Sequence, residues 1–534
     1  MKLFNLNFWN VFTNIIALIF AIPIILIFLS LFDGFNENFE HIYEVVLLEY
    51  SINSIVLVIG VSLVVLFIGV STALLVSSFK FTGSKIFEWA LILPLAIPPY
   101  LLAYVMTEIF EYSGSANMIL RSINFISDNG SLPSIRSLTG AIFIFGFALY
   151  PYVYLITRVA LMNISKPILE SARVLGTNKL NSYIKIVLPI IRPAIFAGLA
   201  LVCMETLSDF GAVQHFAIPT FTTGIFRTWL GMYDLTTAMQ LASILLFVII
   251  LFIFLERNHR ANAQFSLASD TKEQVKLESL SGLKNILALL ICLIPILVGF
   301  IIPVLEIISW SIEIENIFST RFISASLNTM LLAIAAGIIT TIIGIIFNFN
   351  IRISSSKNAG LVNNFISSGY GIPGLILAIG ITQFLTIFDL ILIETGIVIT
   401  GSLFGLIFAY VVKSYALTNN VLESNYKQFS RSIDDSARTL GSSKYNLLKD
   451  IHLPLLRTGI FTSVLLVISE VVKELPATLI LRPFNFDTLA VTVYTFASEE
   501  RIYEAAFPSL FIIGIGLIPI YFISNMIKSA RGLN

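Results

Sequence analysis

The sequence is poor in the residues that build redox, metal or nucleophilic sites. Only two cysteines and four histidines occur among 534 residues, and neither an HExxH motif nor a paired-cysteine motif is present. Cys203 and Cys292 fall in long apolar runs, so we expect them to be packing residues. The histidines are scattered and suggest no Ser-His-Asp arrangement: His41, His215, His259 and His452. We therefore expect a protein that is not an enzyme.

A phosphate-binding loop is also missing. No GxxxxGK[ST] segment occurs, so the chain cannot cradle a nucleotide in the usual way. Any energy from ATP has to come from another subunit, and no cofactor is expected in this chain. The formal net charge is zero, which says nothing about partners. We expect no nucleic-acid partner.

Charged residues are scarce and apolar ones abundant. Only 12% of residues are charged, 57% are hydrophobic and the mean hydropathy is +0.91, values typical of an all-α membrane protein. About twelve runs are long enough to cross a bilayer, for which roughly 17 to 25 residues are needed. They lie near 15–32, 55–78, 86–107, 139–161, 187–207, 238–255, 285–309, 327–349, 361–387, 397–417, 455–472 and 506–527.

The placement of the basic residues orients these spans. If the N-terminus is inside, most of the 32 Lys and Arg residues fall in inner loops and termini, as the positive-inside rule requires. The outer loop 33–50 has acids but no Lys or Arg. We therefore predict that both termini are cytoplasmic. The first apolar run lacks a cleavage site, so we interpret it as a retained span.

One inner segment occurs twice. Residues 166–193, KPILESARVLGTNKLNSYIKIVLPIIRP, return 265 positions later within 431–457, and we call these repeat segments one and two. In each, apolar residues at helical spacing are interrupted by a glycine, which predicts two short helices joined by a turn. The acid near the start, Glu170 or Asp435, suits a first helical turn, and Ser432 suggests a capping box. The matched positions are Glu170, Ala172, Gly176 and Pro189 in segment one, and Asp435, Ala437, Gly441 and Pro454 in segment two.

The duplication covers the whole chain. Asn53-Ser54 matches Asn328-Thr329, and IPPYLLA from Ile97 resembles IPGLILA from Ile372. Both matches have a shift of 275 residues, so the halves differ by ten residues of insertion or deletion before the repeat segments. We predict a first half at 1–256, a cytoplasmic linker at 257–284 and a second half at 285–534. Because each half has an even number of spans, their symmetry axis should follow the membrane normal. Glycines and prolines inside spans either kink helices for packing or line a path: Pro94, Pro98, Pro99, Gly371, Pro373 and Gly374.

Two pairs of acids follow the same 265-residue shift. Glu205 matches Glu470 and Asp209 matches Glu474, at the predicted outer ends of spans five and eleven. The i, i+4 spacing within each pair predicts two carboxylates on one helix face. Such acids can face a cavity or a partner, or they can be helix caps or salt-bridge partners, with Lys473 as a counter-charge. Other charges within the predicted spans are nearly absent.

The repeat segments resemble the EAA loops of permease subunits in ATP-driven importers. ETLSDFGAV and FTTGIFRTW, with KELPATLILRPFNFDTLAVTVYTF, further resemble the fused two-domain permeases of ferric-iron importers over nearly the full length. The resemblance implies the permease fold shared with maltose and molybdate importers and a location in the bacterial inner membrane. It also implies two copies of an ABC ATPase, with ATP and Mg bound there, docked on the eight matched positions. An extracytoplasmic binding protein would deliver Fe(III).

Alternatives remain open at this stage. Thiamine permeases share the fused layout, and polyamine and phosphonate importers use related permeases. A secondary transporter is the alternative from another class, but it would need ionisable groups at mid-membrane and no matched docking loops. Glu205, Asp209, Glu470 and Glu474 are candidates for contact with the solute or the binding protein, and no residue is assigned firmly to a metal.

Overall fold

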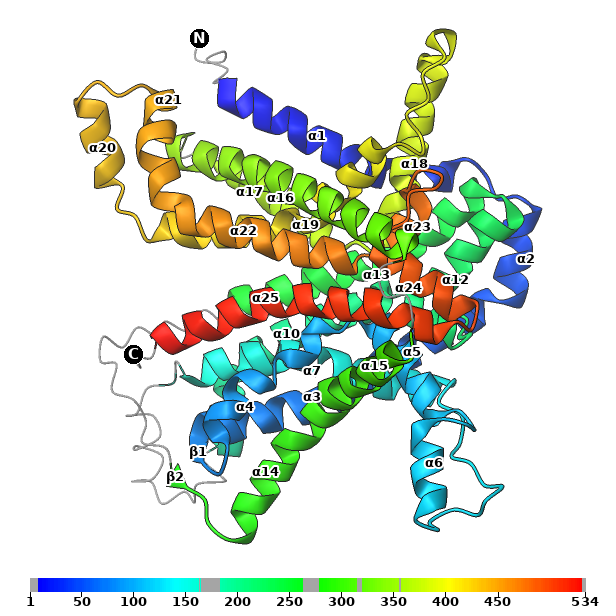
Figure 1. Cartoon of the computed structure of the whole chain (residues 1–534). Coiled ribbons are helices and arrows are strands. Elements are labelled where there is room, and N and C mark those ends of the chain that lie inside the picture. The colour runs from blue at the N-terminus through cyan, green and yellow to red at the C-terminus, as the bar shows by residue number, and fades with distance from the viewer. Residues whose placement is uncertain are drawn as a thin grey trace.

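The structure is almost wholly helical (Figure 1). This computed structural model describes residues 8–162, 164, 183–262, 278–314, 319–354 and 357–530. The helices of the first half are α1 (Phe8–Leu29), η1 (Ser30–Phe32), α2 (Glu37–Val45), α3 (Leu47–Ser78), α4 (Ser84–Ala90), η2 (Leu93–Ala96), α5 (Pro99–Phe110), α6 (Ser115–Ser122), α7 (Leu138–Met162), η3 (Tyr183–Val187), α10 (Leu188–Ser208), α11 (Gly211–His215), α12 (Phe221–Phe226), η4 (Arg227–Gly231) and α13 (Leu235–Asn262).

The second half repeats this series. Its helices are α14 (Leu283–Ile296), η5 (Leu297–Ile301), α15 (Ile302–Ile312), α16 (Thr320–Ser354), α17 (Lys357–Ser367), η6 (Ser368–Gly371), α18 (Gly374–Ile391), η7 (Ile393–Thr395), α19 (Leu403–Lys427), α20 (Ser432–Thr439), α21 (Lys444–Asn446), η8 (Leu447–His452), α22 (Leu453–Lys473), α23 (Pro476–Leu481), α24 (Leu489–Ser498), η9 (Ile502–Ala505) and α25 (Ala506–Ala530). Two short strands, β1 (Phe79–Lys80) and β2 (Glu278–Ser279), pair in parallel.

The apolar helices confirm an all-α membrane protein. Within the described ranges, ten helices are long and apolar enough to cross a membrane, or eleven if one bent pair is counted as a span. Of the twelve predicted spans, 397–417 corresponds to α19, which is not among them because its helix carries more polar residues. The span predicted at 86–107 is not straight: the chain bends by 91° between Ala96 and Pro99. The prolines lack backbone N–H groups and break the helical hydrogen-bond ladder there.

The duplication seen in the sequence is a duplication of structure. α10 and α22 begin and end at positions 265 residues apart, and α7 and α19 do the same. Each of α10 and α22 is preceded by a turn of π-helix, η3 or η8. Pro189 and Pro454 occupy the second position of these helices, where a residue without N–H widens the preceding turn at little cost.

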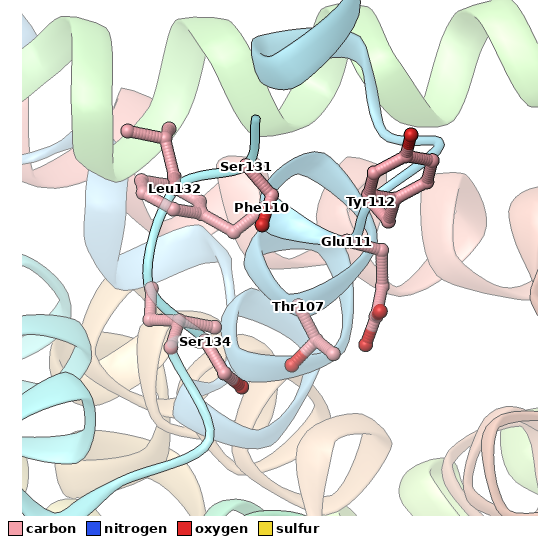
Figure 2. Close-up of a pocket in the computed structure, with 8 residues that line it drawn as sticks. Thr107, Phe110, Glu111, Tyr112, Ser131, Leu132 and Ser134 are labelled. Atoms are coloured by element: carbon pink, nitrogen blue, oxygen red, sulfur yellow. The ribbon is translucent and has the colours of Figure 1, made fainter. Parts of the chain in front are cut away.

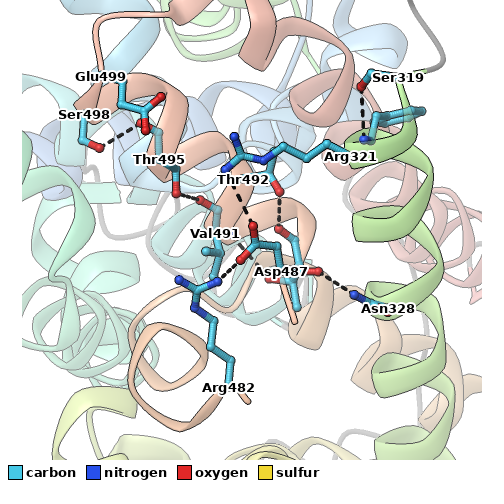
Figure 3. A network of polar contacts seen from close by, with 12 residues as sticks. Ser319, Arg321, Asn328, Arg482, Asp487, Val491, Thr492, Thr495, Ser498 and Glu499 are labelled. Atoms are coloured by element: carbon cyan, nitrogen blue, oxygen red, sulfur yellow. Dashed lines mark hydrogen bonds and ion pairs between the residues drawn. The ribbon is translucent and has the colours of Figure 1, made fainter. Parts of the chain in front are cut away.

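The matched pairs Asn53-Ser54 and Asn328-Thr329 have the same role in both halves. The Asn53 side-chain amide donates to the Pro219 carbonyl at 3.0 Å, and the Asn328 amide donates to the Asp487 carbonyl at 3.0 Å (Figure 3). The following hydroxyls, of Ser54 and Thr329, accept the backbone N–H groups of Phe221 and Leu489. Each half thus fixes the loop between two short helices, α11 and α12 or α23 and α24, with the same two hydrogen bonds.

The first helix of each half packs against the other half. α1 contacts α16, α17 and α18, whereas α14 and α15 contact α3, α4 and α5. Two glycines allow close approach: a Cβ at Gly380 would meet the Pro23 carbonyl at 2.6 Å, and one at Gly299 would meet the Phe147 carbonyl at 2.8 Å. The halves are therefore interlocked in space, although they are consecutive in the sequence.

The two ends of the helical bundle differ. The start of α1, the helices α20 and α21, the strands and the end of α25 lie at the left of Figure 1, whereas α2, α6 and α12 lie at the right. Asn285 exchanges hydrogen bonds with Thr82 beside β1, so the start of the second half is attached to the first half at this left end.

Candidate functional site

Repeat segment two forms the first predicted short helix, α20, at one end of the molecule (Figure 1). The second predicted helix is not a separate short one, because α21 continues through η8 into α22 as a single helix from Lys444 to Lys473. α20 ends at Thr439, and Gly441 takes φ +83°, the left-handed conformation that closes a helix. The Gly441 N–H reaches the Arg438 carbonyl and the Ser442 N–H reaches the Ala437 carbonyl, so the closing turn is complete. The predicted helix-ending turn at Gly441 is confirmed, whereas its role in ATPase coupling stays a prediction.

The remaining matched positions of segment two divide into buried and exposed ones. Ala437 is buried in a small cluster with Phe349 and Leu447. Asp435 is exposed in the first turn of α20, as predicted, and Pro454 is exposed at the start of α22. The predicted capping box is wrong, because α20 begins at Ser432 itself and the residue at its N-cap, Arg431, makes no side-chain cap.

The start of α20 is held instead by Asp434. Its carboxylate accepts from Arg352 Nε at 2.6 Å and from His452 Nε2 at 2.9 Å, and all three side chains are nearly buried. Burial alone would raise the pKa of Asp434, but the hydrogen bonds from Arg352 and His452 outweigh it and hold the pKa below its usual value. Sequence reasoning missed this clamp, because its partners lie 82 and 18 residues away from Asp434.

Repeat segment one falls largely outside the described residues. Glu170, Ala172 and Gly176 lie there, while Pro189 is half-buried near the start of α10. The clamp has no counterpart in the sequence of the first half: the positions equivalent to Arg352, Asp434 and His452 are Ser77, Leu169 and Val187.

The four predicted acids gather near the ends of α10 and α22. Glu205 lies within electrostatic reach of Glu470 and Glu474, and Glu474 within reach of Asp209. The prediction of shared helix faces is wrong, because α10 ends at Ser208 and α22 ends at Lys473. At Asp209 and Glu474 the backbone becomes extended, and each carboxylate caps the next short helix by accepting the N–H of Ala212 or Ala477, at 2.9 and 3.0 Å.

Two lysines accompany these acids. Lys413, in the middle of α19, forms an ion pair with the second carboxylate oxygen of Glu474, whose residue is only 5% exposed. Lys473 donates to the Leu95 carbonyl of the other half at 3.2 Å. The expectation that charges within spans are nearly absent is therefore wrong for α19. We call the six residues together the charged cluster: Glu205, Asp209, Lys413, Glu470, Lys473 and Glu474.

Tyrosines surround the charged cluster. The Tyr370 hydroxyl donates to Glu205 Oε1 at 3.2 Å, which links the two halves. Tyr100, at the start of α5, is 4% exposed, and its hydroxyl has no hydrogen-bond partner among the described residues. A Cβ built at Gly211 would meet the Tyr100 Cβ at 2.6 Å and Leu475 Cδ2 at 2.9 Å, so Tyr100 packs against the start of α11 beside the residue that follows Glu474. Glu474 and Asp209 lie within electrostatic reach of its hydroxyl. Tyr410, on α19, shares a hydrogen bond with Thr478 at 2.6 Å.

The two cysteines are buried, as predicted for packing residues. Among the described residues, no group of three or more His, Cys, Asp and Glu side chains is arranged to hold a metal ion.

A pocket of about 190 Å³ lies apart from the charged cluster, beyond the far end of α5. Figure 2 shows Thr107, Glu111 and Ser134 around it. Thr107 also shares a hydrogen bond with His215 Nε2 at 3.0 Å. The pocket brings together one carboxylate and a few hydroxyls without a converging set of charges.

Comparison with known proteins agrees with this arrangement. Residues 65–258 match the family described as binding-protein-dependent transport system inner membrane component. These residues are a permease domain of that family. The matched region begins within α3 and includes the equivalents of the helices from α17 to α24, so the second half repeats these helices of the matched region.

Relatives of this permease include proteins of matching length. It is 23% identical over 527 residues to an Fe(3+)-transport system permease protein, FbpB 2, of Haemophilus influenzae, covering 97% of this chain and 98% of the relative. A ferric transport system permease protein of Actinobacillus pleuropneumoniae is 22% identical over 429 residues, covering 77% of this chain and 60% of the relative. A sulfate transport system permease protein of Salmonella typhimurium is 25% identical over 187 residues, which is 34% of this chain and 65% of the relative.

Proposed function

We propose that this chain is the transmembrane subunit of an ATP-driven importer that passes Fe(III) from an extracytoplasmic binding protein into the cytoplasm. The observation that carries the proposal is the full-length similarity to a permease named for Fe(3+) transport. The sulfate relative matches a third of the chain, and the family comprises permeases that depend on binding proteins.

Energy would enter through the repeat segments. Leu440 is 88% exposed and Tyr445 is 64% exposed, so α20 and α21 present apolar surface to whatever lies beyond the membrane. A groove in a cytoplasmic ABC ATPase would cover these side chains, and ATP and Mg would be bound in that subunit. The presence of two repeat segments favours two ATPase copies, one on each segment. Glu170, Ala172, Gly176 and Pro189 would serve segment one as Asp435, Ala437, Gly441 and Pro454 serve segment two.

The end of the bundle with α20 would face the cytoplasm of a bacterium. The basic loops favour this orientation, and it places both termini on the inner side of the cytoplasmic membrane. Glu205, Asp209, Glu470 and Glu474 would then lie toward the outer side, under the short helices α11 and α23. Their negative charge would attract a cation delivered from that side.

Transport in reconstituted vesicles tests the proposal. The permease, an ATPase and a binding protein from the same source are combined, and uptake of radioactive iron is followed with and without ATP. We expect ATP-dependent uptake that requires the binding protein. Uptake of thiamine or a polyamine in place of iron would contradict the solute, and iron uptake driven by an ion gradient without the ATPase would contradict the class.

A further inference from the structure

The charged cluster is asymmetric although the acids in it are duplicated. Asp209 and Glu474 are equivalent positions, and so are Glu205 and Glu470. The other groups occur once: the equivalents of Lys413 and Lys473 are Ala148 and Ser208, and the equivalent of Tyr100 is Leu375. Four carboxylates and two ammonium groups give the cluster a net negative charge when all are ionised. A bound cation would neutralise part of that charge.

The oxygens of Asp209 and Glu474 are only partly used. Asp209 caps α11 with Oδ1 alone, accepting the N–H groups of Ala212 and Val213, so Oδ2 takes no part in the cap. Glu474 caps α23 with Oε1 and uses Oε2 for Lys413. One oxygen of each carboxylate is therefore available, or becomes available when Lys413 moves away.

The Tyr100 hydroxyl is a polar group without a hydrogen-bond partner in the part of the chain that the structure describes. A buried hydroxyl without a hydrogen bond costs roughly 1–3 kcal/mol. Tyr104, one turn later, also has a hydroxyl without a partner and lies within electrostatic reach of Asp209. An unsatisfied phenol that packs against the start of α11, within electrostatic reach of two carboxylates, is an oxygen donor available to a ligand that enters between the halves.

We infer that Asp209, Glu474 and Tyr100 form a transit site for a hard trivalent cation, and that Lys413 is the resident cation which that metal displaces. This inference rests on the proposed function, which supplies Fe(III) as the solute. Carboxylate oxygens suit hard cations, and tyrosine oxygen is a known ligand of ferric iron. As the Fe–O bond forms, the Tyr100 phenol loses its proton to water, while the Lys413 ammonium keeps its own and moves away from Glu474.

The lysine gives the site a means of release. When the metal leaves, Lys413 returns to Glu474 and again neutralises the buried carboxylate, whose unpaired charge would otherwise be costly. Binding is therefore an exchange of one cation for another, which keeps it weak enough for transport.

The phenol gives the experiment a spectroscopic signal. Purified permease in lipid nanodiscs is titrated with Fe(III) citrate, and the visible charge-transfer band of an Fe(III)–phenolate is recorded. We expect a band in the wild type, no band in Tyr100→Phe, and an unchanged band in Tyr43→Phe, which alters an exposed tyrosine of α2. Because the Tyr100 hydroxyl has no hydrogen-bond partner within the described part of the chain, Tyr100→Phe should fold as well as the wild type.

Lys413→Gln tests the exchange. Removing the competing charge should lower the Fe(III) concentration that gives a half-maximal signal at least tenfold. Away from bulk water, the interaction between two unit charges at close range exceeds the free energy that corresponds to a tenfold change. Lys413→Arg should leave it near the wild-type value. Lys427→Gln removes a lysine from an exposed pair with Glu423 and should have no effect.

The outcomes separate this inference from the proposed function. A band that persists in Tyr100→Phe, or no band in the wild type, overturns the site. If the wild-type vesicles import iron while Tyr100→Phe and Lys413→Gln import it at the same rate with the same KM, the site is also overturned but the transporter stands. If no vesicles import iron, the proposed function fails, whatever the spectra show.

Discussion

Gly374 shows how a single missing side chain makes room for a charge. A Cβ built at this position would overlap Oε1 of Glu474, the oxygen that caps α23. The sequence singled out Gly374 as a break within a span, and the structure adds a second reason for a glycine there. The carboxylate can approach the start of α18 only because no side chain occupies that space.

Gly374→Ala is expected to push the Glu474 carboxylate away from its cap and from Lys413. Overpacking of this kind costs about 1–3 kcal/mol, so the permease should unfold at a lower temperature and transport more slowly. Gly360→Ala is a matched control, because its Cβ would meet nothing within 4 Å. The unfolding temperature and the rate of iron uptake are measured for both variants. If the two variants have the same unfolding temperature and uptake rate, the role of Gly374 is contradicted.

Gly441 has the opposite surroundings. Nothing lies within 4 Å of its Cβ position, yet its φ of +83° is one that β-branched residues rarely adopt. Gly441→Val, with Gly176→Val in segment one, should distort the turn after the first short helix and uncouple transport from ATP hydrolysis, while the protein remains in the membrane. Gly441→Asn, which tolerates left-handed backbone, should retain most of the activity. Full transport by the double valine variant would contradict a role of the repeat segments in docking the ATPase.

At the scale of elements, the clamp on α20 joins a membrane helix to repeat segment two. Arg352 lies in the last turn of α16, and it binds Asp434 of α20 as well as the carbonyls of Tyr426, Phe429 and Ser430. A displacement of α20 by a partner would therefore be transmitted to α16 through a nearly buried ion pair. The first half lacks these residues, so its segment is expected to be held by other contacts.

Arg352→Met is expected to release α20. Removing one partner of a buried ion pair costs about 3–5 kcal/mol, because the other charge is left uncompensated. Hydrogen exchange at the α20 amides should become faster, and uptake should fall. Lys427→Met breaks the exposed pair with Glu423, where the cost is about 0–1 kcal/mol, and serves as the control. Unchanged exchange in Arg352→Met would mean that the apolar cluster around Ala437 alone holds α20.

The same clamp should weaken in acid and not near neutrality. The pKa of Asp434 is lowered in the folded protein, so its stabilising contribution is complete above the unfolded value, about 3.9 for aspartate. The contribution is lost as pH falls through the lower folded pKa. Exchange at the α20 amides, corrected for intrinsic rates, should be constant from pH 8 to pH 7. Burial lowers the pKa of His452, so a first loosening is expected as pH falls below about 6.5, the unfolded value for histidine, and the Asp434 contribution is lost only in strong acid. Loosening already between pH 8 and pH 7 would contradict both assignments.

Local patterns in the sequence predicted much of this architecture. Apolar runs located every span as a helix or helix pair, and the 265-residue shift matched α10 to α22 to the residue. Predictions failed where distant residues decide the outcome. The i, i+4 spacing predicted that Glu474 shares a helix face with Glu470. Its actual ion-pair partner, Lys413, lies 61 residues earlier, on another helix. The prolines that break the helix at the 91° bend, Pro98 and Pro99, were visible in the sequence, although the angle itself was not.

At the scale of the whole molecule, orientation is the prediction with the widest consequences. Tags placed after Asn534 and between residues 256 and 285 should both be protected from protease in intact cells and cleaved in inverted vesicles. The physical reason is the concentration of basic residues at the same end of both halves. A tag in the acidic loop 33–50 should show the reverse pattern. Cleavage of either of the first two tags from outside would overturn the topology.

The packing of each half's first helix against the other half imposes an order on biosynthesis. α1 is complete at Leu29, but α18, one of its partners in the second half, is complete only at Ile391, 362 residues later. At translation rates of about 5–20 residues per second, α1 waits roughly 20–70 s before that surface exists. During this time lipid must solvate the face that α18 will later cover. The first half therefore cannot complete its packing before the second half has been synthesised. Because both halves belong to one chain, the partner of α1 always follows in the same translation event.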